Sequence, residues 1–140
     1  MLGNIEWSAR PSNSSFIQHS ENLLDESGAT IPGLTVDLRI RQGLYVQDCR
    51  YDFSVFQIKG GRRLRVYQIN VRPIDKSSHT ESNGEIWFGS HHHFGERAER
   101  FPSEITLGCD HHEEWFRLFL KNANIDFGGK YIPPQHSGWF

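Results

Sequence analysis

The sequence predicts an α+β fold, in which an antiparallel sheet of about five strands packs against a C-terminal helix and a short N-terminal helix. Apolar and polar residues alternate strictly over residues 34–41, which is the period of a half-buried strand. Further strand-like segments follow through short glycine turns, and a helical pattern begins after Asp110. A chain of 140 residues has the length of a single domain, 1–140.

The N-terminal part is expected to begin with an irregular lead-in over residues 1–13. A short helix is predicted over residues 16–26, because Ser14 or Ser15 can cap its first turn and Gly28 can end it. Its apolar residues would lie on one side of the helix, and they are Phe16, Ile17, Leu23 and Leu24. This helix would cover one face of the sheet.

The sheet is expected to contain the alternating segment and four more. The four are residues 44–49, 51–58, 64–71 and 85–94. Gly60-Gly61 predicts a tight hairpin between the second and third of these four. Residues 74–84 are predicted to form a polar loop, residues 96–104 a charged connecting loop, and residues 105–107 a brief edge strand.

The clearest helix is predicted over residues 110–122. Asp110 can cap its N-terminus, and Glu113 can reach back in a capping-box arrangement. Trp115, Leu118 and Phe119 would form the buried stripe. Asn residues at 122 and 124 would end the helix, and residues 126–140 would form an extended tail against the body of the domain.

Composition restricts the class of protein. The chain is 36% hydrophobic and carries a net charge of −2, so no global positive field attracts nucleic acid. A local basic patch at residues 59–65 is either a contact for RNA or a solvated hairpin tip. No signal-peptide pattern and no apolar run long enough for a bilayer is present. These features predict a cytoplasmic protein without a membrane partner.

The two cysteines, Cys49 and Cys109, do not form a disulfide framework or a thiolate zinc site. Cys49 is expected to behave as a small, half-buried hydrophobic residue. Cys109 precedes the predicted helix N-terminus, which lowers a thiol pKa. A Cys109–histidine dyad is therefore an option, although a cysteine without a catalytic role is the simpler interpretation.

Residues 79–94 contain four of the eight histidines, and this concentration points to chemistry. On a strand His91 and His93 share one face, whereas His92 points to the other. His79 can return to the pair across the polar loop. His79, His91 and His93 are therefore candidate ligands of a divalent metal such as zinc. The alternative to a metal site is that these histidines are surface residues on a half-exposed sheet.

The same three histidines also permit metal-free catalysis, with one neutral and one protonated imidazole as general base and general acid. Arg65 and Arg72 are the candidate phosphate contacts that would stabilise the developing charge. A second polar cluster, His111-His112-Glu113-Glu114, could supply another ligand, or could simply complement the helix dipole.

The string His79-x4-Gly84-Glu85-Ile86-x2-Gly89-Ser90-His91-x-His93-Phe94 resembles a motif of the TumE-like toxin–antitoxin group and of a related bacterial and phage family. The strand at residues 65–70 occupies the place of an Arg/Tyr-x-x-Asn strand in those proteins. The resemblance covers residues 62–125. It implies a toxin-like or mobile-element accessory protein that acts on nucleic acid or on a protein partner.

Three functions are consistent with the sequence. The first is a ribonuclease-like toxin that uses the histidine cluster and has an antitoxin as partner. The second is a non-catalytic phage inhibitor of a host defence protein, with Trp87 and Trp139 as interface anchors. The third is a small metal-binding domain. An open sheet edge would also permit a homodimer.

Overall fold

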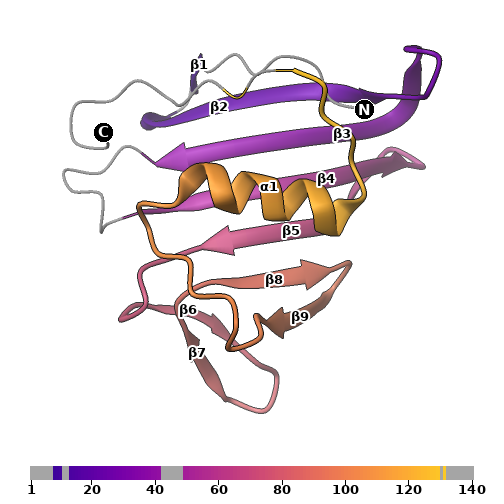
Figure 1. The fold of residues 1–140 in the computed structure, drawn as a ribbon. Coiled ribbons are helices and arrows are strands. Elements are labelled where there is room, and N and C mark those ends of the chain that lie inside the picture. The colour runs from indigo at the N-terminus through magenta and orange to yellow at the C-terminus, as the bar shows by residue number, and fades with distance from the viewer. Residues whose placement is uncertain (1–7, 11–12, 42–48, 130, 132–140) are drawn as a thin grey trace.

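The computed structural model describes residues 8–10, 13–41, 49–129 and 131. Its main sheet has seven antiparallel strands in the order β1-β2-β3-β4-β5-β8-β9, and β6 and β7 form a separate two-stranded sheet (Figure 1). The elements are β1 (Ser8–Arg10), β2 (Asn13–Leu24), β3 (Thr30–Arg41), β4 (Tyr51–Lys59), β5 (Arg62–Val71), β6 (Ser77–Thr80), β7 (Ile86–Phe88), β8 (His91–Phe94), β9 (Arg97–Arg100) and α1 (His112–Ala123). The predicted α+β class is therefore confirmed in its coarse form.

Helix α1 lies across one face of the main sheet (Figure 1). Strand register brings Leu38, Phe53 and Ile69 into one row on this face, and all three are fully buried. From the helix, Trp115, Phe116, Phe119 and Leu120 are buried against them. This two-layer core buries apolar area on both elements and is the main source of stability in such a domain.

Helix α1 starts two residues later than the sequence predicts. Its N-cap is His111, which makes no side-chain capping bond, so the predicted capping box of Asp110 and Glu113 is wrong. Residue Asn124 ends the helix in the left-handed conformation, with φ at 57°, as asparagine commonly does. In the tail, Tyr131 stacks on Phe116 and Phe127 packs edge-on against it.

The helix predicted over residues 16–26 is wrong, because β2 runs through most of this segment and pairs with β3 from Phe16↔Arg41 to Leu24↔Thr30. Alternation places Ile17 and His19 on the buried face. Leu23 continues the same alternation and is also buried, beside a register irregularity between Asn22 and Leu24. Because the polar residue His19 lies among the inward-facing residues of β2, the sequence of this segment does not show a clear alternation of apolar and polar residues.

Strand pairing revises the second half of the sheet. Residues 85–94 do not form one strand, because Gly89 adopts a φ of 77° and separates β7 from β8. Residues 97–100 pair with β8 as β9, where a connecting loop was expected. Residues 105–107 are not a strand. The hairpin through Gly60-Gly61 is confirmed, and both glycines have positive φ, as its turn requires.

A disulfide joins Cys49 to Cys109, with the two Cα atoms 5.5 Å apart. This bond contradicts the expectation that Cys49 is an unpaired hydrophobic residue, and it removes the thiolate from any Cys109 dyad. It ties the segment before β4 to the segment before α1, where the Tyr51 hydroxyl donates to the Cys109 carbonyl. The predicted strand at residues 44–49 lies, except for Cys49, outside the described residues.

Within the described part of the chain, no helix is long and apolar enough to span a membrane.

Removing the disulfide should destabilise the protein. The bond closes a loop between residues 60 positions apart, and a loop of that size corresponds to roughly 4 kcal/mol in the chain-entropy description. We expect the Cys49→Ser/Cys109→Ser double variant to lose about 2–4 kcal/mol of unfolding free energy, measured by urea denaturation. Equal stability of the variant and of the oxidised protein would contradict this, as would titration of two free thiols in the native protein.

Candidate metal centre

Strand β8 lies between two environments. His92 faces α1, where its ring stacks on Phe101 at 4.2 Å between centroids and its Nδ1 accepts from the Tyr67 hydroxyl at 2.9 Å. Burial raises the pKa of Tyr67 to about 12, so the phenol keeps the proton that it donates. His92 is therefore a hydrogen-bonded core residue. His91 and His93 point to the opposite face, as strand alternation predicts.

The β6–β7 hairpin places His79 beside this pair. The hairpin turns through Glu81–Gly84, where the Gly84 amide donates to the Glu81 carbonyl. One nitrogen from each of His79, His91 and His93 lies within 4.8 Å of the others. His91 Nε2 and His93 Nε2 are 3.1 Å apart. The convergence predicted from the sequence is therefore observed.

The hairpin also shields the pair from solvent. His91 and His93 are 3% and 7% exposed, although no helix covers their side of the sheet in the described chain (Figure 1). The Trp87 ring packs on His79, 4.7 Å between centroids, and on His91 at 6.3 Å. Arg100 lies over the outer side of Trp87 and pairs with Glu85. His79 is the more accessible member of the cluster.

Burial and positive neighbours keep this pair of imidazoles neutral. Desolvation, then His79 and Arg72, lowers the pKa of His91 to about 4. Desolvation, then Arg65 and His91, lowers the pKa of His93 to about 3. At pH 7 both rings therefore offer a lone pair, which suits metal ligation or a general base. Neither ring is the protonated general acid that the metal-free mechanism needs.

Hydrogen bonds specify the tautomer of His91. The Ser78 hydroxyl donates to the Gly89 carbonyl at 2.6 Å, so its oxygen is left to accept from His91 Nδ1 at 3.3 Å. With the proton on Nδ1, Nε2 of His91 presents its lone pair to His93. Nδ1 of His93 is buried and has no hydrogen-bond partner in the described chain.

The geometry is suited to a small divalent cation. A tetrahedral site with metal–nitrogen bonds of about 2.0–2.1 Å requires nitrogens roughly 3.3 Å apart, close to the 3.1 Å between His91 and His93. Rotation of the His79 side chain would bring in the third nitrogen. Three protein ligands leave a fourth position open for water, as in catalytic zinc sites.

The two candidate phosphate contacts differ in their bonding. Arg72 donates to Asp52 at 2.7 Å and to the carbonyls of Tyr51 and Val71, and its side chain is 16% exposed. Arg65 donates to Gln68 and to the Gly95 carbonyl and is half-buried. Both guanidinium groups act electrostatically on the cluster, but only Arg72 is neutralised by a carboxylate.

Other sequence candidates lie elsewhere. Within the described residues, His79, His91 and His93 are the one group of three potential metal ligands, so the cluster at 111–114 does not join them. In the basic patch at residues 59–65, Arg63 is engaged with Asp37 and with the Phe56 ring. Trp87 is 9% exposed and is not available as an interface anchor. Trp139 lies outside the described residues.

Sequence reasoning did not identify Ser78, Glu81 or Trp87 as parts of this site. Ser78 and Glu81 flank His79, but a serine and a glutamate in a polar loop carry no distinctive signal. The alternation of Ser77–Thr80 is too short to predict a strand. Only the pairing of His79 with Trp87 across the hairpin reveals their common location.

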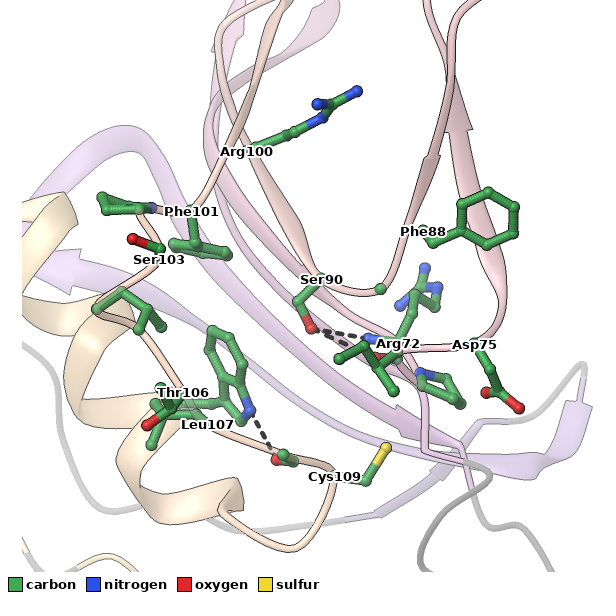
Figure 2. A pocket seen from close by; sticks show the side chains of 17 residues that line it. Arg72, Asp75, Phe88, Ser90, Arg100, Phe101, Ser103, Thr106, Leu107 and Cys109 are labelled. Atoms are coloured by element: carbon green, nitrogen blue, oxygen red, sulfur yellow. Dashed lines mark hydrogen bonds between the residues drawn. The ribbon is translucent and has the colours of Figure 1, made fainter.

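A cavity of about 880 Å³ lies on the helix side of β8, away from the three histidines. Figure 2 shows Phe88 and Phe101 on its walls and the Ser90 hydroxyl bonded to the Arg72 backbone. Trp115 also lines it and donates its indole N–H to the Gly108 carbonyl. No histidine lines this cavity. The cavity and the histidine cluster are therefore separate features.

Comparison with protein families, curated proteins and solved structures finds no match for this chain.

Acid should destabilise the metal-free protein through this pair. Because the folded-state pKa values of about 4 and about 3 lie below the ordinary value of about 6.5, the unfolded state binds more protons as the pH falls from 6.5 toward 4. Each ring then costs up to about 1.4 kcal/mol per pH unit. We expect the unfolding free energy in EDTA to fall steeply over this window.

The His91→Gln/His93→Gln variant tests the assignment. Its slope of unfolding free energy against pH should be shallower by about two protons, measured by urea denaturation at several pH values. Lys121→Gln, an exposed change on α1, should keep the wild-type slope. An unchanged slope in the double variant would show that the pair is not the source.

Proposed function

We propose that this domain binds one divalent cation of the zinc class through His79, His91 and His93 and cleaves RNA at that centre. The observation that supports the proposal most directly is the convergence of three imidazole nitrogens within 4.8 Å. Two of the rings are neutral at pH 7 and held in a desolvated site. The cation would supply a Lewis acid and a bound water of lowered pKa at the open position.

The protein's own groups have separate roles in this proposal. The three histidines hold the centre on two elements, β8 and the β6–β7 hairpin. Arg65 provides a phosphate contact near His93, because its guanidinium bonds the Gly95 carbonyl and the Gln68 amide oxygen and pairs with no carboxylate in the described part of the chain. Arg72, held by Asp52, maintains positive potential beside His91. Positive charge of this kind stabilises phosphate as charge develops during cleavage.

RNA is proposed as the substrate for two reasons. The motif around His79 and His91–His93 resembles that of the TumE-like group, which implies action on nucleic acid or through a protein partner. Lys59 and Arg62 are also exposed at the tip of the β4–β5 hairpin, on the sheet that carries Arg65. An antitoxin-like protein is the proposed partner. Because the net charge is −2, the protein as a whole does not attract RNA. RNA would therefore be contacted through this local basic surface.

Metal analysis of untagged protein tests the centre. We expect about one equivalent of zinc after dialysis, and His91→Ala or His93→Ala should reduce binding by at least roughly 100-fold because each removes a ligand. The matched control is His111→Ala, which removes a histidine away from the cluster. Zinc bound equally by the wild type and the His91 variant would contradict the assignment.

Cleavage of end-labelled RNA tests the activity. We expect EDTA to abolish cleavage and added zinc or manganese to restore it. His93→Ala should lower the cleavage rate by about 100-fold or more, because the site would lose a ligand and would no longer hold the cation. Arg65→Gln should weaken cleavage by about tenfold and leave cation binding unchanged. Stoichiometric cation binding without cleavage of any RNA would contradict the nuclease while leaving a metal-binding domain.

A further inference from the structure

The segment around β6 provides more than the ligand His79. Ser78 and Glu81, on either side of it, each place an oxygen beside a histidine of the cluster. We infer that Ser78 and Glu81 are positioning residues that orient the rings of His91 and His79 toward the cation. This inference rests on the proposed cation site and specifies how that site is held.

Ser78 acts on His91. Its hydroxyl has a single proton, which is committed to the Gly89 carbonyl at 2.6 Å. The oxygen can therefore only accept from His91 Nδ1, 3.3 Å away. This places the imidazole proton on the side of the ring remote from the cluster. A ligand histidine commonly donates its second N–H to an oxygen in this way, which sets the ring orientation and the basicity of the ligating nitrogen.

Glu81 acts on His79. Its Oε1 lies 3.5 Å from Nε2 of that ring, and this nitrogen is buried without a closer hydrogen-bond partner among the described residues. A small approach of the carboxylate would form a charge-assisted bond and leave Nδ1 as the ligating atom. The backbone of Glu81 is fixed, because its N–H donates to the Glu85 carbonyl and its carbonyl accepts from the Gly84 N–H.

His93 differs from the other two ligands. Its Nδ1 has no partner in the described chain, so the ring is placed by strand β8 and by packing against His79 and His91. One short segment therefore supplies a hydrogen-bond acceptor to His91 and a carboxylate beside His79. A change in that segment should weaken the cation site although neither Ser78 nor Glu81 is a ligand.

The experiment measures zinc affinity by competition with a chromogenic chelator. The variants are Ser78→Ala, Ser78→Thr and Glu81→Gln, and the matched control is Ser77→Ala, an exposed serine of the same strand. We expect Ser78→Ala and Glu81→Gln each to lose roughly 10-fold to 100-fold in affinity. Ser78→Thr keeps the hydroxyl, so its zinc affinity should lie within about threefold of the wild-type value. Ser77→Ala should have the same zinc affinity as the wild type.

Two further measurements distinguish the possible outcomes. The absorption spectrum of the cobalt-loaded protein should change in Ser78→Ala but not in Ser77→Ala, because ring orientation affects ligand geometry. The unfolding free energy of the metal-free variants shows whether the hairpin itself is damaged. Unchanged zinc affinity in Ser78→Ala and Glu81→Gln overturns the inference while the proposed site stands. Equal losses in Ser78→Ala and Ser78→Thr would also overturn it for Ser78. Absence of zinc binding by the wild type would instead refute the proposed function.

Discussion

Strict alternation of side chains along β8 assigns three neighbouring histidines to two different environments. In three consecutive histidines, the outer two belong to a polar, desolvated cluster and the central one belongs to the core beneath α1. A shift of one residue in the pairing with β5 would exchange these roles and place two imidazoles against the aromatic core. The pairing of Ile69 with His92 therefore specifies the site as well as the fold.

Desolvation and ligation are connected at this cluster. Burying His91 and His93 without a charge costs less than burying them as cations, so the fold favours the protonation state that binds metals. The cover is aromatic on one side, through Trp87, and positive on the other, through Arg65 and Arg72. Desolvation and the positive charge of the two arginines disfavour an imidazolium. Together they make the site selective for a neutral ligand set at physiological pH.

The sequence predicted the parts of the site that follow from local rules. The alternation over residues 34–41 and the shared face of His91 and His93 depend on a period of two, and the hairpin depends on the positive φ that Gly60-Gly61 can adopt. All three are confirmed. The segment at 16–26 failed because its buried residues include His19, which interrupts the apolar pattern of β2. Gly89 could have been either a strand residue or a break, and only its positive φ decides.

Long-range pairing explains the other differences. The disulfide joins residues that no spacing rule relates, because its formation depends on where β4 and α1 bring Cys49 and Cys109. Likewise, Ser78 and Glu81 are ordinary polar residues until the hairpin folds back on β8. Local sequence carries information about period and turns, whereas these contacts depend on which elements meet in three dimensions.

The separation of β6 and β7 from the main sheet has a thermodynamic consequence. A two-stranded ribbon is at best marginally stable by itself, and this one brings a third nitrogen donor to a pair that β8 already holds in place. If an ion engages all three rings, part of its binding free energy would therefore be used to order the ribbon. The apparent affinity would include the cost of closing the ribbon, and the ribbon's amide exchange would slow as the ion concentration rises.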